Sequence, residues 1–195
     1  MKLLIGDWAR QFHTPQQVQK ALRRLEYNRE KNGETLFSAE EALRRGTAHC
    51  FEAAFIAAAV LEVHGHPPVI LSLESKDGLD HVLFLFQQNG RWGTIGRSRD
   101  EGLHGRAPVF KNWRELAWSY YDPFIDKTGK ITGYQIAHLD ETQTDWRFGK
   151  KNVWKAEQYL IDLKHQPLKS SMARYKKVFK DYKQKGPLLS GPHWL

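Results

Sequence analysis

The only cysteine of the chain, Cys50, stands where a helix is predicted to begin. In the stretch Gly46 to Leu61, GTAHCFEAAFIAAAVL, the sole charge after the cysteine is Glu52, and five of the last eleven residues are alanine. A helix that is apolar on nearly every face is expected inside a domain. The unpaired N–H groups of its first turn favour an anion beside them. A cysteine at this place therefore has a physical route to a lowered pKa and a reactive thiolate.

His81 favours this reactive interpretation over the alternative of an inert, buried cysteine, which is the common state of free cysteines. A cysteine nucleophile needs a base within hydrogen-bond reach, and that base needs a third group to hold it. His81 opens HVLFLF, which is predicted to be a strand buried on both faces. A sheet packed against the cysteine helix can place this imidazole over the thiol.

A hairpin signal extends the argument to a third residue. Gln88-Asn89-Gly90-Arg91 predicts a two-residue type I′ turn, because Asn-Gly accepts positive φ angles. The numbers of facing residues then sum to 179, as those of Gln88 and Arg91 do, which puts Ser98 opposite His81. Gly96 and Asp100 are expected on the same face.

These residues resemble the transglutaminase-like superfamily, within the papain-like cysteine-proteinase fold. The resemblance covers roughly residues 36–99 and rests on Gly46 to Glu52 with the alanine-rich helix and Gly65, on Asp80-His81, and on Gly90-Arg-Trp92. Such proteins place a cysteine at a helix start, a histidine on the next strand and an aspartate on the strand after it. The resemblance implies that Cys50 is the nucleophile and His81 the base, with the backbone N–H of Cys50 in the oxyanion site.

The sequence departs from the family at the aspartate. That residue usually follows the hairpin tryptophan by about four positions, where this chain has Gly96. The third catalytic residue is then Ser98 or Asp100, or the role is vacant; Asn112 and Asp122 are more distant candidates. A serine would stabilise an imidazolium less well than a carboxylate does.

Composition and element order predict one α+β domain over residues 1–195. We expect an N-terminal helical segment over 1–35, a core of about 36–140 in which the Cys50 helix packs on an antiparallel sheet, and a basic helical extension over 146–195. Helices are expected from Thr14 to the Asn32-Gly33 stop, from Ser38 to Gly46, and over 112–120, 153–163 and 170–184. Strands are expected over 69–73, 81–86, 91–98 and 131–139, and an ordered loop over 99–108.

One cysteine excludes an internal disulfide, and the N-terminus lacks a signal-peptide core. The longest uncharged apolar run, Ala53 to Leu61, is nine residues, too short for a bilayer. A cytoplasmic protein without membrane association is expected.

The net charge of +8 lies entirely in the last fifty residues, which hold 12 Lys and Arg against 3 Asp and Glu, whereas residues 1–145 hold 18 against 19. Aromatic residues interleaved with these lysines are one pattern of nucleic-acid binding. Met172, Tyr175, Phe179 and Tyr182, however, follow one another at three- and four-residue spacings. We favour a helix docked on its own domain, with the lysines as its solvated face.

No metal or cofactor is expected. His64 and His66 are predicted at the far end of the helix from Cys50, about 20 Å away at 1.5 Å per residue, so they cannot share a site with it. Glu52 is expected as a first-turn acid on electrostatic grounds alone.

The sequence therefore predicts a cysteine-dependent acyl-transfer enzyme that acts on a peptide or other amide-bearing substrate, either as a hydrolase or as a transglutaminase-like transferase. The alternative is an inactive domain of the same fold that serves as a binding module, whose basic tail contacts nucleic acid or an acidic protein.

Overall fold

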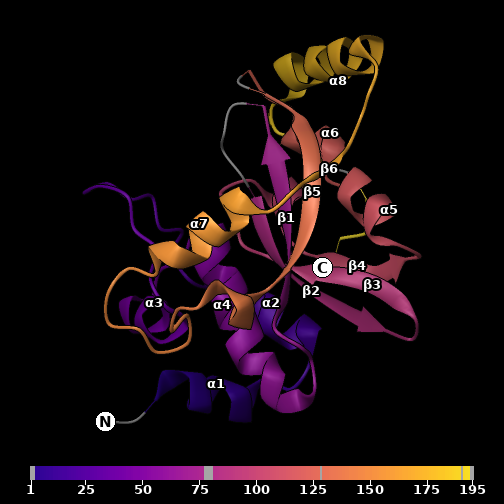
Figure 1. Cartoon of the computed structure of the whole chain (residues 1–195). Helices are drawn as coiled ribbons and strands as arrows, with labels where there is room; N and C mark the ends of the chain where they lie inside the picture. The colour runs from indigo at the N-terminus through magenta and orange to yellow at the C-terminus, as the bar shows by residue number, and fades with distance from the viewer. Residues whose placement is uncertain (1–2, 77–80, 128, 190, 194–195) are drawn as a thin grey trace.

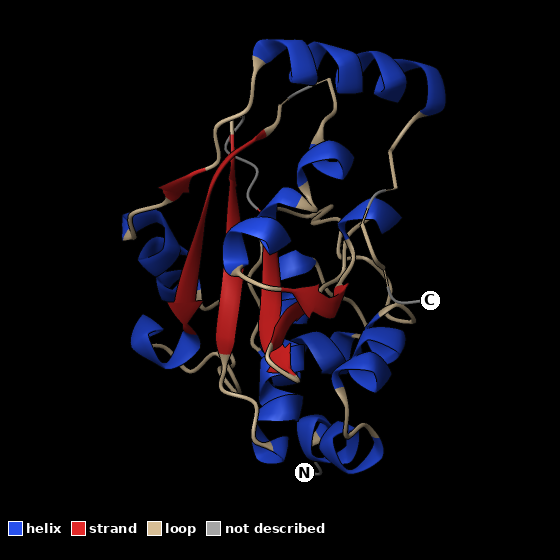
Figure 2. Ribbon diagram, turned by 90° about the vertical axis from the view of Figure 1, so that its right-hand side faces the viewer, coloured by secondary structure: helices blue, strands red, loops and turns tan. Residues whose placement is uncertain are grey.

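A six-stranded antiparallel sheet with helices on both faces forms the centre of the molecule (Figures 1 and 2). The computed structural model describes residues 3–76, 81–127, 129–189 and 191–193. The spatial strand order is β4-β3-β2-β1-β5-β6. The strands are β1 Val69–Ser75, β2 His81–Gln88, β3 Arg91–Ile95, β4 Arg106–Phe110, β5 Ile131–His138 and β6 Gln166–Pro167. The chain is an α+β protein, as the sequence predicts.

Eight α-helices lie within the described residues. They are α1 Leu4–Gln11, α2 Pro15–Leu22, α3 Ala39–Arg45, α4 Cys50–Leu61, α5 Trp113–Trp118, α6 Tyr121–Phe124, α7 Trp154–Asp162 and α8 Met172–Lys185. Short 3-10 turns lie at η1 Glu62–His64, η2 Glu101–Leu103 and η3 Leu139–Thr142. None of the described helices is both long and apolar enough to cross a bilayer.

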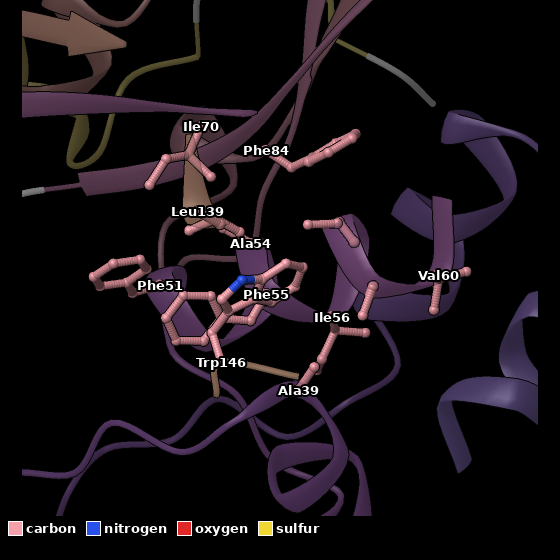
Figure 3. Close-up of a cluster of buried hydrophobic side chains, with 14 of the residues drawn as sticks. Ala39, Phe51, Ala54, Phe55, Ile56, Val60, Ile70, Phe84, Leu139 and Trp146 are labelled. Atoms are coloured by element: carbon pink, nitrogen blue, oxygen red, sulfur yellow. The ribbon is translucent and has the colours of Figure 1, made fainter. Parts of the chain in front are cut away.

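Helix α4 lies against one face of the sheet, and every residue after Cys50 is buried. Its alanines allow this close approach, and its larger side chains fill the remaining space. The Phe55 ring lies 4.5 Å from that of Phe51 and 6.1 Å from that of Trp146, measured between centroids. Figure 3 shows these rings gathered with Ile70 and Phe84 of the sheet. The first residue of α4 is thereby held at a fixed place relative to the strands.

Side chains of the central strands alternate between two hydrophobic cores. Ile70 and Phe84 belong to the core under α4, whereas Leu71, Leu83 and Leu85 belong to a second core on the other face, which also includes residues of α5, α6 and α8. Strand β2 is thus buried on both faces over His81 to Phe86, as predicted.

The hairpin register confirms the sum of 179 over five pairs, from Gln88 opposite Arg91 to Phe84 opposite Ile95. Asn89 and Gly90 have φ values of 50° and 70°, as a type I′ turn requires. β3 ends at Ile95, three residues short of Ser98.

The helix that begins at the Thr14 cap ends at Leu22, so the prediction that it continues to Asn32-Gly33 is wrong. The chain instead turns to run beside the residues that precede Cys50. The backbone N–H of Glu26 donates to Gly46 O at 3.1 Å, and that of Asn28 donates to Ala48 O at 3.3 Å. This pairing delivers residues 27–36 to the start of α4.

Two further predictions about elements are incomplete. Residues 99–108, expected as a loop, contain η2 and the start of β4, which extends the sheet beyond the hairpin. Helix α1 lies within the predicted helical segment over 1–35, but its bounds were not predicted; its first turn is held by the buried Glu40 carboxylate, which accepts from Leu4 N and Ile5 N, both at 3.1 Å.

The C-terminal helices α7 and α8 agree closely with their predicted ranges. Helix α8 lies at the end of the molecule opposite α1 (Figure 1). Val178 is its buried residue, and Tyr175 and Phe179 pack against the second core. Met172, in contrast, is 57% exposed. The helix docks through part of the predicted stripe, and its lysines face outward.

Candidate active site

Cys50 is the first residue of α4 and is partly exposed in a cleft. Burial acts to raise the pKa of its thiol, but hydrogen bonds with His49 and His81 outweigh burial and hold the pKa well below its ordinary value. The helix N-terminus favours the same charge. Both effects stabilise the thiolate relative to the neutral thiol.

His81 opens β2 next to this thiol and is 4% exposed. Its Nε2 lies 2.7 Å from the carbonyl oxygen of Leu103, and its ring stands edge-on to that of Tyr120 at 6.1 Å. A carbonyl only accepts hydrogen bonds, so Nε2 carries the proton that is shared with Leu103. Nδ1 then remains as the nitrogen that can meet Cys50. A backbone carbonyl thus occupies the position at which the sequence led us to expect Ser98 or Asp100.

Ser98 does not pair with His81, because the ladder stops at Ile95. The next residue, Gly96, is held by Gln19 of α2, which is 2% exposed. Its amide nitrogen donates to Gly96 O and its oxygen accepts from Gly96 N, both at 2.9 Å. In the hairpin register Gly96 falls opposite Leu83 at a non-hydrogen-bonded position, so these groups point toward the β4 side, where the Gln19 oxygen also accepts from Gly105 N at 3.2 Å.

Ser98 and Asp100 still line the cleft, but within the described residues neither hydrogen-bonds to His81. The Ser98 hydroxyl accepts from Asp100 N at 3.3 Å, which ties the two residues to each other. The more distant candidates have other partners: Asn112 caps α5 by accepting from Glu115 N at 2.9 Å, and Asp122 accepts from Arg174 at 2.7 Å.

Gly96 leaves no room for a side chain, which leads to a prediction. A Cβ there would lie 2.2 Å from a methyl carbon of Leu83. We expect Gly96→Ala to lower the free energy of unfolding by about 2 kcal/mol, as overpacked cores do. Urea unfolding measures this. Gly6→Ala in α1, where the nearest atom would be 3.6 Å away, is the matched control and should be neutral or stabilising. Equal effects of the two substitutions would contradict the packing argument.

The hydrogen-bond network around Glu52 was not predicted from the sequence, because the place of this acid in the first turn of the helix was sufficient to explain it. Its carboxylate is fully buried. It accepts from Phe37 N at 2.9 Å, from His49 N at 3.0 Å and from the side chain of Asn28 at 3.1 Å. Through these hydrogen bonds Glu52 joins the segment before α3 to the start of α4. A capping-box pattern at residues 49–52, with His49 in place of Ser or Thr, is the signal in the sequence.

His49 is a second imidazole at the thiol. Its Nδ1 accepts from Phe51 N at 3.2 Å, and its Nε2 lies 3.0 Å from Thr35 O. Burial lowers the pKa of His49, but the hydrogen bond with Cys50 and the charge of Glu52 outweigh burial and raise it to about 9. The cap bond from Phe51 opposes protonation, because a protonated Nδ1 cannot accept it. Since both ring nitrogens already have backbone partners, we assign His49 to capping α4.

The cleft has a volume of about 720 Å³. Its walls come from residues 27–30 and 34–36, the starts of α4 and β2, residues 98–100 and 103, residues 123–127, α7, and two residues from the end of the chain, Tyr182 and Pro187. Tyr27 stands in this wall; burial and the neighbouring Cys50 raise the pKa of its phenol, so it stays protonated. Such a cleft can admit an extended chain past the sulfur.

The histidines at the far end of α4 do not reach this site. The His64 ring lies 5.1 Å from that of His13, and its Nε2 is 2.9 Å from Ala9 O. In the described part of the chain, no group of three or more histidine, cysteine or acidic side chains is arranged to hold a metal ion. Asp80, part of the family resemblance, lies outside the described residues.

Comparison with known proteins adds no assignment, since no family model and no curated protein matches the chain. The proposal of a function therefore depends on the residues and geometry given above.

Proposed function

We propose that this chain is a cysteine-dependent acyl-transfer enzyme with a transglutaminase-like arrangement of the papain-like fold. The observation that carries the proposal is Cys50 in hydrogen-bond contact with His81, whose other ring nitrogen is held by Leu103 O at 2.7 Å. A lowered thiol pKa at the floor of a cleft is typical of catalytic cysteines. The substrate class is a peptide or another amide-bearing chain.

In the proposed reaction the Cys50 thiolate attacks a carbonyl carbon and forms a tetrahedral intermediate. The backbone N–H of Cys50, at the N-terminus of α4, contributes to stabilising the oxyanion. Protonated His81 gives its Nδ1 proton to the leaving group, and a thioester remains on the sulfur. Neutral His81 then takes a proton from the acceptor, which is water in a hydrolase and an amine in a transferase.

An activated ester tests this scheme without knowledge of the natural substrate. With p-nitrophenyl acetate we expect a burst of p-nitrophenol stoichiometric with the enzyme and an acetyl group on Cys50 detectable by mass spectrometry. Cys50→Ser should abolish both. If added glycine methyl ester accelerates turnover and is acetylated, the enzyme is a transferase; if only water accepts the acyl group, it is a hydrolase. A wild-type protein that never becomes acylated on Cys50 would refute the proposal.

One observation favours the second candidate function, an inactive binding module of the same fold. His81 contacts no carboxylate within the described residues, so no carboxylate stabilises an imidazolium there while the thiolate charge moves to the substrate. In that case Cys50 should remain unacylated, and the exposed lysines of α8 should bind an acidic protein or nucleic acid with an affinity that falls steeply as salt is added.

A further inference from the structure

Because His81 is held by a main-chain carbonyl, its orientation depends on the path of the loop that carries Leu103. A carbonyl aligns an imidazole through one hydrogen bond and contributes no net charge. Leu103 ends the short turn η2, in a segment between β3 and β4. The groups that fix this segment therefore fix the base.

Arg106 binds the loop on both sides of Leu103. It is fully buried, and its two terminal nitrogens reach the neighbouring carbonyls: Nη2 donates to Gly102 O at 2.7 Å, and Nη1 donates to His104 O at 2.9 Å. The rigid fork of a guanidinium suits this arrangement, in which two acceptors must be held at a set separation.

The guanidinium is itself anchored by the two residues between α5 and α6. Its Nε donates to Ser119 Oγ at 3.1 Å, and Nη2 also donates to Ser119 O at 3.2 Å. Its central carbon lies 3.8 Å from the centroid of the Tyr120 ring, and the Tyr120 hydroxyl donates to His104 O at 3.0 Å. Two residues that are adjacent in the chain thus hold Arg106 and one of its loop carbonyls.

The partners of this buried cation are neutral. No acidic side chain in the described residues pairs with Arg106; its acceptors are carbonyls, a hydroxyl and the ring of His193. A buried charge without a counter-ion is costly unless its hydrogen bonds are satisfied. An apolar side chain could fill the same space without the desolvation cost of a buried charge. We therefore ascribe the arginine at this position to the carbonyls that it holds in place.

We propose that Arg106 is a positioning residue that holds the Leu103 carbonyl against Nε2 of His81 and so keeps the Nδ1 lone pair of neutral His81 directed at Cys50. The inference rests on the proposed Cys50–His81 chemistry. It assigns to a buried arginine and a main-chain carbonyl the orienting task that a carboxylate performs elsewhere.

The test measures the alkylation of Cys50 by iodoacetamide as a function of pH in Arg106→Lys, which keeps the charge and loses the fork. We expect the rate near pH 6 to fall about tenfold, while the rate near pH 9, where the thiol ionises without help, stays near that of the wild type. Glu40→Gln is the control, since Glu40 is also buried and holds α1 far from the loop. It should lower stability without changing the pH profile.

Two further measurements keep the proposal falsifiable if Arg106→Lys fails to fold. Tyr120→Phe retains the ring under Arg106 and removes the hydroxyl that bonds to His104 O and to Thr94 Oγ1, so a smaller shift in the same direction is expected. In Cys50→Ala, nitrogen NMR of the neutral His81 ring should show the proton on Nε2. An unchanged pH profile in folded Arg106→Lys or Tyr120→Phe, or a proton on Nδ1, would overturn the inference. An unchanged profile in His81→Ala would instead overturn the proposed function itself.

Discussion

Replacing His81 with alanine is expected to slow the alkylation of Cys50 near pH 6 by roughly one to two orders of magnitude. Hydrogen bonds with His49 and His81 hold the pKa of the thiol well below its ordinary value against the effect of burial. Without the His81 ring, the hydrogen bond with His49 alone opposes the effect of burial, so the pKa rises toward that of an ordinary thiol, about 8.5. A small share of thiolate then remains near pH 6, whereas near pH 9 both proteins are largely ionised and their rates converge. The measured quantity is the ratio of the alkylation rate near pH 6 to the rate near pH 9, compared between the two proteins.

Ser98→Ala and Asp100→Asn are the matched controls for this experiment. Both residues line the cleft, and the Ser98 hydroxyl bonds to Asp100 N. We expect wild-type pH profiles from both variants. A shift in Asp100→Asn as large as that in His81→Ala would return the third catalytic role to this aspartate. A wild-type profile in His81→Ala would remove His81 as the base.

Glu52→Ala is expected to cost roughly 3 kcal/mol of the free energy of unfolding, because three donors lose their acceptor in a fully buried place. Two of these donors are the backbone N–H groups of Phe37 and His49, which cannot turn toward other partners. The midpoint of urea unfolding reports the loss. Glu52→Gln keeps one acceptor oxygen and should fall between the wild type and the alanine variant.

Glu41→Ala supplies the comparison with an acid at the surface. Glu41 pairs with Arg45 at 2.8 Å on α3, and Arg45 is about half exposed. The loss of such a pair should cost less than about 1 kcal/mol. Equal losses for Glu41→Ala and Glu52→Ala would mean that the buried carboxylate does not fasten the start of α4.

Local signals in the sequence were sufficient to predict the elements that carry Cys50 and His81. The alanine-rich run after Cys50 predicted a helix that begins there, and α4 begins at Cys50. The Asn89-Gly90 turn gave the register of β2 and β3 for five pairs. Each of these signals acts over a few residues, so their physical causes are visible in a single stretch of sequence.

The group that hydrogen-bonds to the second ring nitrogen of His81 could not be predicted from local signals. The ladder that would place Ser98 beside His81 stops at Ile95, and the next residue, Gly96, is held by Gln19, which lies 77 residues away in the chain. The group that replaces it is a carbonyl, which every residue carries and which no residue type signals. The role of Arg106 could not be predicted either, because the sequence does not distinguish a buried arginine with uncharged partners from a solvated one.

The prediction for the path of residues 23–36 is wrong for a related reason. The apolar spacing at Leu22 and Leu25 fits a helix, and the helix signals continue to Asn32. The segment instead forms hydrogen bonds with residues 46–48. In this position Asn28 bonds to Glu52 and the segment lines the cleft. Tertiary partners override a helix propensity of a few tenths of a kcal/mol per residue.

The Leu103 carbonyl changes what mutagenesis of this site would reveal. Any side chain at position 103 leaves the oxygen in place, so side-chain substitutions at positions 50, 81 and 103 would report two sensitive residues where three groups form the proposed site. The third would become visible only through backbone chemistry, such as replacing the peptide unit with an ester and weakening the acceptor. Enzymes built in this way would look like dyads in any survey based on side chains.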